Sequence, residues 1–191
     1  MLKIGITGGI GAGKSIVCRI IESLGYPVFY SDAEAKKIIT NDPEVQTRLI
    51  SRYGDAIYEY GELNRALLAE KIFQNPDERI YVNDLIHPRV RKGFEHFATK
   101  SNAQFVFNEA AILFETGSYK HFDKTILVIA PENLRIERVM KRDNCSASLV
   151  KERMNSQWSD KKKTPLADAV IVNDGERSLL SQIEKILIEI A

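Results

Sequence analysis

The sequence predicts an α/β fold built on a five-stranded parallel sheet. Short apolar runs, rich in β-branched or aromatic residues, alternate with longer stretches of helical periodicity along the 191 residues. This alternation is typical of parallel strands covered by helices on both faces of the sheet. The predicted strands are Leu2–Thr7, Val28–Tyr30, Phe105–Asn108, Thr125–Ala130 and Ala169–Val172.

Helical periodicity fills the chain between and after these strands. Apolar residues recur at helical spacing from Ile16 until Gly25, which ends the first helix. Residues 33–100 contain several helical patterns and no strand pattern, which is more than one crossover requires. We therefore expect one main domain over residues 1–191 with a helical substrate-binding insert at about 33–100. The other predicted helices are Ala33–Thr40, Glu44–Tyr53, Arg65–Gln74, Asp77–Ile86, Pro88–Thr99, Pro131–Asp143, Ser146–Gln157 and Glu176–Ile190.

Composition is that of an ordinary globular protein. Hydrophobic residues make up 44% and charged residues 28%, and a formal net charge of +1 gives no general attraction to nucleic acid or membrane. No apolar run approaches the ~20 residues that span a bilayer, and no signal-peptide pattern is present, so we expect a cytoplasmic protein. Cys18 and Cys145 are far apart and give no evidence of a disulfide framework. The sequence carries no signal for an oligomeric state.

The first predicted strand runs into the motif G-x-x-x-x-G-K-[ST], residues 8–15, which opens the first helix. Glycines let the backbone turn its amides inward, and the helix N-terminus attracts phosphate. Lys14 then reaches the β and γ phosphates and the Ser15 hydroxyl can ligate Mg²⁺. A Gly-rich turn of purely structural use is the alternative. The residues expected to bind ATP are Gly9, Gly11, Ala12, Gly13, Lys14, Ser15 and Ile16.

Carboxylates follow two of the predicted strands, where parallel sheets bind their ligands. Asp32 follows the second strand, where it could accept a proton from an attacking hydroxyl or help hold Mg²⁺. Its alternative role is to cap the helix that begins near Ala33. Glu109 ends the third strand and could hold a metal through water, or cap the next segment.

A helical face carries Arg135, Arg138 and Arg142 at positions i, i+3 and i+7. Such charges usually face solvent, yet a phosphoryl-transfer enzyme needs cations on the transferred group and often brings them on a mobile lid. We expect Arg142 to contact phosphate.

Basic residues continue through the next helix. Arg153 and Gln157 are four residues apart, and a run of three lysines follows at 161–163. We expect a basic lid at about 141–163 in which Arg138 and Arg153 take part, whereas the lysine run is expected to face solvent.

Two aromatic side chains, His87 and Trp158, lie outside these motifs. His87 precedes Pro88 in the insert and is either a hydrogen-bonding group of a substrate pocket or a satisfied turn residue. Trp158 is expected to pack at a junction rather than to stack on adenine.

These motifs, in this order, resemble the dephospho-coenzyme A kinases, and the resemblance runs nearly from end to end. Three positions depart from the family pattern. Ile16 stands where Thr is commoner, Tyr30 replaces the first aspartate of an Asp-Ala-Asp stretch, and Ala111 stands in place of the proline of a Pro-Leu-Leu-Phe-Glu segment. The matching segments are residues 6–15, Asp32 to Lys36, Asn64-Arg65 with Leu68 and Phe73, Leu85 to Pro88, Ala111 to Glu115, Arg142-Asp143, Arg153 with Gln157, and Ala167 to Ile171 with Asn173 and Gly175.

The resemblance implies an α/β P-loop NTPase fold in three layers and an ATP-dependent kinase. It would move the γ-phosphoryl group to the ribose 3′-hydroxyl of dephospho-coenzyme A, giving coenzyme A and ADP. Asp32 would be the catalytic carboxylate, aided by Lys14 and Arg142, with Mg²⁺ as cofactor. The insert would hold the acceptor through Arg65 and His87. ATP and dephospho-coenzyme A would then be the partners, with no nucleic acid or membrane.

Two rival functions share the phosphate-binding motif. One is a kinase of another small acceptor, such as a nucleoside monophosphate or shikimate. The other is a nucleotide-dependent switch protein. The sequence argues against a switch because it has no Asp-x-x-Gly motif after the third strand and no Asn-Lys-x-Asp motif for binding guanine.

Overall fold

The computed structural model describes residues 1–190, which form two compact units. The sheet unit comprises residues 1–30 and the chain from Ser101 onward, and the helical unit comprises Ser31–Lys100. No helix in the described residues is both long and apolar enough to cross a membrane.

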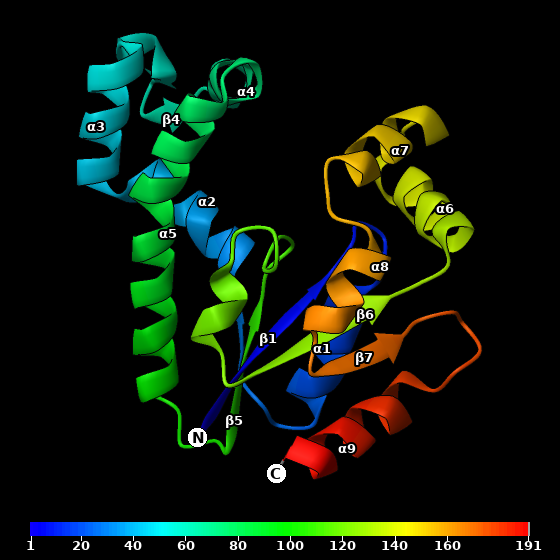
Figure 1. Ribbon diagram of the computed structural model, residues 1–191. Coiled ribbons are helices and arrows are strands. Elements are labelled where there is room, and N and C mark those ends of the chain that lie inside the picture. Colours follow the sequence, from blue (N-terminus) through cyan, green and yellow to red (C-terminus); the bar gives the residue numbers. More distant parts are fainter. Residues whose placement is uncertain (191) are drawn as a thin grey trace. The chain divides into compact units, whose positions relative to one another are not determined.

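The sheet unit is built on a five-stranded parallel sheet in the order β2-β5-β1-β6-β7 (Figure 1). The predicted α/β fold class and its five strands are confirmed, with ends that differ by one residue at most. The strands are β1 (Leu2–Gly8), β2 (Val28–Tyr30), β5 (Phe105–Glu109), β6 (Lys124–Ile129) and β7 (Ala169–Val172).

One face of the sheet is covered by α1 (Lys14–Ser23) and α9 (Leu179–Ile190), which contact one another. Their apolar faces bury against the strands and form the largest part of the core. The fully buried members of this core include Ile4, Ile6, Val17, Cys18, Ile21, Phe107, Val128 and Ile171. Helix α9 begins three residues later than predicted because Asp174 caps the amides of Glu176 and Arg177 in a turn before it.

On the other face the chain between β5 and β6 folds back over β1. Leu113 and Phe114 are buried there, and a short 3₁₀ helix, η2 (Ser118–His121), follows. A Cβ at Gly5 would lie 2.6 Å from Leu113 Cδ2, so β1 needs a glycine under this connection.

Three helices follow β6: α6 (Glu132–Asp143), α7 (Ala147–Asn155) and α8 (Asp160–Lys163). The lysine run at 161–163, expected to face solvent, instead forms α8, and the Lys163 side chain is fully buried. That expectation was wrong for Lys163 because the helical turn directs its side chain inward, toward a buried carboxylate.

The helical unit contains α2 (Ser31–Asn41), α3 (Pro43–Tyr53), α4 (Arg65–Gln74) and α5 (Pro76–Thr99). The predicted break at Pro88 was wrong, since α5 is one continuous helix of 24 residues. Proline removes one backbone hydrogen bond. Burial of Val82, Ile86, Val90 and Phe94 on either side keeps both halves of the helix packed.

A two-stranded hairpin, β3 (Tyr58–Glu59) and β4 (Glu62–Leu63), also lies in this unit. The expectation that residues 33–100 hold no strand was therefore wrong. Strands of two residues carry no periodicity, and the turn uses positive φ at both Tyr60 (53°) and Gly61 (82°). Tyrosine rarely adopts that conformation, so the turn gave no clear signal.

Candidate active site

The G-x-x-x-x-G-K-[ST] motif forms the loop between β1 and α1, as expected. Gly11 and Gly13 have φ of 77° and 96°, in the left-handed region that favours glycine. Gly13 is also the N-cap of α1, and no side chain in the described part of the chain caps that helix. The first amides of α1 are therefore available to an anion at the positive end of the helix. This geometry is that of a phosphate-binding loop.

Arg135 on α6 supports the loop from behind. Its side chain is buried, Nε donates to the Ile10 carbonyl at 2.9 Å, and Nη1 pairs with Asp160 Oδ2 at 3.1 Å. A Cβ at Gly11 would lie 2.5 Å from the Arg135 carbonyl oxygen, so the loop needs glycine there to lie this close to α6.

Asn173, the residue directly after β7, holds the loop from a second side. Its Nδ2 donates to the Ala12 carbonyl at 2.9 Å, while Arg138 donates to the Asn173 backbone carbonyl at 3.2 Å and to Oδ1 at 3.3 Å. The structure thus links Arg138 to the loop through Asn173. Sequence reasoning gave Asn173 no role, although the rule that ligands bind after parallel strands pointed to its position.

Gln157 makes a third contact with the loop. Its Oε1 accepts a hydrogen bond from the Ile10 backbone N–H at 2.9 Å. The sequence indicated Gln157 by its place four residues after Arg153 and by the family resemblance. Neither predicts this contact, which joins residues 147 positions apart.

Lys14 lies along the loop, with its ammonium 3.0 Å from the Gly8 carbonyl and 3.8 Å from Glu109 Oε1. Both side chains are nearly buried, which strengthens their attraction. Glu109 ends β5, so the structure brings the predicted strand-end carboxylate beside the loop lysine. Ser15 and Ile16, in the first turn of α1, are exposed.

Tyr30 is half-buried and pairs in register with Glu109 across the sheet. Burial, and then a hydrogen bond with Glu22, raises the pKa of Tyr30 well above its usual range. The phenol is therefore neutral and contributes packing, where the resembling family carries a carboxylate.

Asp32 lies in the first turn of α2, in the helical unit. It is exposed, and because α2 already begins at Ser31, Asp32 lies inside the helix and is not the N-cap of a helix that begins near Ala33. The capping alternative is therefore wrong.

Arg142 and Arg153 meet at Asp143, between α6 and α7. Arg142 donates to both carboxylate oxygens at 2.7 and 3.0 Å, and Arg153 donates to Oδ2 at 3.0 Å. The hydrogen bond from Arg142 lowers the pKa of Asp143 below its usual value. Both guanidinium groups are substantially exposed, so together they present positive charge to solvent.

In the helical unit, Arg65 lines a cavity of about 220 Å³ between α2, β4 and α4. The walls are mainly apolar and Lys36 adds a second cation. His87 does not line this cavity; it lies within α5, so its reading as a turn residue was wrong. Burial lowers the pKa of His87, partly offset by Asp84, and the imidazole is neutral near pH 7.

In the described part of the chain, no group of three or more His, Cys, Asp or Glu side chains is placed to hold a metal ion. The hydroxyl of Ser15 and the nearby Glu109 carboxylate are donors of the kind that Mg²⁺ takes when phosphates and water complete its coordination. The residues present therefore fit magnesium bound together with a nucleotide.

Known families and proteins match this chain over nearly its whole length. The family model described as dephospho-CoA kinase matches residues 2–178. A dephospho-CoA kinase from Bacteroides fragilis is 41% identical over 187 residues, covering 97% of this chain and 91% of the relative. One from Porphyromonas gingivalis is 40% identical over 188 residues, covering 98% of this chain and 93% of the relative.

Solved structures agree with this match. A Campylobacter jejuni dephospho-CoA kinase is 28% identical with a TM-score of 0.69, over 98% of this chain and 96% of that chain. The Thermus thermophilus protein TT1252 is 34% identical with a TM-score of 0.88, over 100% of this chain and 98% of that chain. A shikimate kinase from Acinetobacter baumannii, 16% identical with a TM-score of 0.53 over 100% of this chain and 93% of that chain, shares the fold alone.

Proposed function

Because this chain belongs to the dephospho-CoA kinase family, we propose that it transfers the γ-phosphoryl group of ATP to the ribose 3′-hydroxyl of dephospho-CoA. The products are coenzyme A and ADP, and the step is the last one of coenzyme A biosynthesis. The observation that carries this conclusion is the family match over residues 2–178. Neither a kinase of shikimate or nucleoside monophosphates nor a switch protein is favoured.

The donor site is the phosphate-binding loop. Backbone amides from Gly11 to Lys14, the Lys14 ammonium and the uncapped first turn of α1 bind the phosphates of ATP, while Gly9 and Ile16 flank them. Support comes from the positive φ of Gly11 and Gly13 and from the position of Lys14 beside the loop.

Magnesium binds at this loop with the nucleotide. Ser15 would supply a hydroxyl ligand. Glu109, which lies beside Lys14, would contact the metal ion through a water molecule. When bound, Mg²⁺ neutralises charge on the phosphates during transfer.

Asp32 orients or deprotonates the acceptor hydroxyl. Its carboxylate comes two residues after the end of β2 and is exposed without a hydrogen-bond partner among the described residues. A free carboxylate can accept the proton that leaves the ribose hydroxyl.

The acceptor is held in the helical unit. Arg65 and Lys36 place two cations at a mainly apolar cavity, an arrangement that suits an acceptor that carries phosphates. His87 lies on α5 outside this cavity and would offer the acceptor a neutral hydrogen-bonding group there.

Arg142 and Arg153 belong to a lid that adds positive charge around the transferred phosphoryl group. The proposed lid covers about residues 141–163. Within it, Gln157 is bonded to Ile10 and Lys163 is buried, so the part that moves is residues 141–156. Arg138 supports the lid at its base through Asn173.

The test is an assay of ADP formation with dephospho-CoA, AMP, adenosine and shikimate offered separately. We expect efficient turnover with dephospho-CoA alone. Lys14→Ala is the matched control, and it should lower turnover by at least about 10² because it removes a cation from the donor phosphates. Equal kcat/KM for dephospho-CoA and AMP would overturn the assignment.

A further inference from the structure

The backbone of Ile10, in the phosphate-binding loop, is held at both its N–H and its C=O. Gln157 Oε1 accepts from the N–H at 2.9 Å, and Arg135 Nε donates to the carbonyl at 2.9 Å. Arg135 is itself fixed by Asp160 at the start of α8. The shape of the loop therefore depends on where the segment 157–160 lies.

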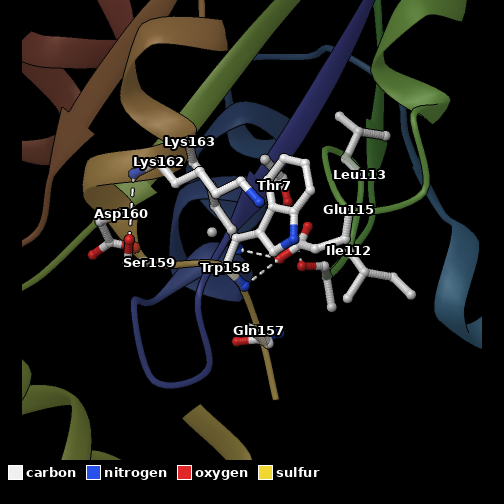
Figure 2. Close-up of polar contacts among 12 residues, drawn as sticks. Thr7, Ile112, Leu113, Glu115, Gln157, Trp158, Ser159, Asp160, Lys162 and Lys163 are labelled. Carbon is white, nitrogen blue, oxygen red and sulfur yellow. Dashed lines mark hydrogen bonds and ion pairs between the residues drawn. The ribbon is translucent and has the colours of Figure 1, made fainter. Parts of the chain in front are cut away.

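A buried ion pair fixes that segment. Lys163 Nζ lies 2.7 Å from Glu115 Oε1, and the Lys163 side chain is fully buried while that of Glu115 is 13% exposed. Figure 2 shows the two side chains pointing toward one another beside the Trp158 ring. Glu115 comes from the chain between β5 and β6 and Lys163 from α8, so the pair joins two distant parts of the sheet unit.

Glu115 has a second partner that connects it to the phosphate-binding loop. The same oxygen, Oε1, accepts the backbone N–H of Trp158 at 3.1 Å (Figure 2). Trp158 follows Gln157 directly, so this bond sets the backbone from which the Gln157 side chain reaches Ile10. Lys162 Nζ lies over the Trp158 ring, 3.4 Å from its centre.

Burial of the Glu115 and Lys163 charges costs desolvation free energy, and a contact that served only to stabilise the fold could avoid this cost by using apolar side chains. Glu115 Oε2 is buried without a hydrogen-bond partner among the described residues, and Lys163 Nζ is buried with Glu115 Oε1 as its charge partner. Burying two charges costs more than burying apolar groups of the same size, so the pair is a poor source of stability by itself.

We propose that Glu115 is a positioning residue for ATP binding, acting through Trp158 and Gln157 on the backbone N–H of Ile10. Lys163 keeps the Glu115 carboxylate in place. The inference rests on the proposed use of the loop as the ATP site, which binding of an unreactive ATP analogue to the unchanged protein checks separately.

Two double variants separate positioning from stability. Glu115→Gln/Lys163→Met removes both charges but keeps an oxygen that accepts the Trp158 N–H. Glu115→Leu/Lys163→Met removes the charges and that oxygen. Both replace a buried pair by groups of similar volume, so we expect both to fold. If the second does not, Glu115→Met/Lys163→Met takes its place, since the flexible Met side chain adapts to irregular cavities.

The dissociation constant of the unreactive ATP analogue is the readout, measured by calorimetry beside the melting temperature. We expect the Gln variant to bind within about twofold of the unchanged protein and the Leu variant to bind about five- to tenfold more weakly, the scale of one hydrogen bond. The KM for dephospho-CoA should not change. Equal affinity of the two double variants would overturn the proposal.

A cycle with Gln157→Ala tests the route. In the Glu115→Gln/Lys163→Met background, this change should weaken analogue binding about tenfold, whereas in the Glu115→Leu/Lys163→Met background it should have little further effect. Fully additive losses would show that Glu115 does not act through Gln157 and would also overturn the proposal. Failure of the unchanged protein to bind the analogue would instead count against the proposed function.

Discussion

Asn173 Nδ2 donates to the Ala12 carbonyl at 2.9 Å, which joins the end of β7 to the phosphate-binding loop across 161 positions of sequence. Both residues are buried, so the bond is shielded from water. A Cβ at Gly13 would lie 2.0 Å from the same nitrogen, which means that this amide and the loop glycine require one another.

Replacing Asn173 by Asp should weaken ATP binding. The carboxylate keeps the size of the side chain but cannot donate to Ala12, and its charge repels phosphate. We expect the dissociation constant of an ATP analogue to rise about tenfold or more, on the scale of a lost buried hydrogen bond, with KM for dephospho-CoA little changed. Titration calorimetry measures this, and unchanged affinity would remove Asn173 from the site.

Asp32→Asn should lower kcat by roughly 10² to 10⁴, the usual contribution of a positioned acid or base. ATP affinity should stay the same because the residue is proposed to act on the acceptor. Since Asp32 makes no hydrogen bond in the described chain, the melting temperature should also be unaffected. Unchanged turnover in a well-folded variant would contradict the catalytic role.

Arg65→Ala should raise KM for dephospho-CoA by roughly tenfold and leave ATP binding unchanged, because its side chain lines the cavity of the helical unit. Adenosine, which lacks the phosphates and the arm, should be used equally badly by both proteins. If KM for ATP rises instead, the cavity does not serve the acceptor.

Hydrogen exchange should locate the lid. Adding an unreactive ATP analogue should slow exchange across residues 141–156, because phosphate neutralises the repulsion between Arg142 and Arg153. Residues 157–163 should exchange more slowly in both states, since the backbone N–H groups of Trp158, Lys162 and Lys163 are hydrogen-bonded. Identical exchange with and without analogue across 141–156 would exclude the lid.

Arg142→Ala should lower turnover by roughly 10³.

Stability should fall at alkaline pH partly through Cys18. Burial is the main cause that raises the pKa of this thiol from 9.0 to about 12. Above pH 9 the unfolded chain has lost the thiol proton while the folded chain keeps it, so unfolding is favoured as the pH rises toward 12. The melting temperature of the unchanged protein should therefore fall more steeply between about pH 8 and 10.5 than that of Cys18→Ala. Parallel curves would contradict this, since the cavity left by Ala lowers stability equally at every pH.

Sequence patterns predicted well where local geometry decides the outcome. The short apolar runs of β1 and β7, rich in β-branched residues, are typical of strands. Gly11, Gly13 and Lys14 belong to a motif that needs no distant partner to be recognised. The pattern failed at Pro88, where burial of neighbouring side chains outweighs the local cost of proline in α5.

By itself, the sequence determined the parallel sheet, the phosphate-binding loop with Lys14 and Ser15, and the family to which the chain belongs, because each depends on residues close together in the chain or on their order along it. Only the tertiary structure decided that Gln157, Asn173 and Arg135 hold the loop, and that Glu115 meets Lys163 in the interior. These contacts join segments far apart in sequence. A hydrogen bond depends on distance and direction in space, and no spacing along the chain carries that information.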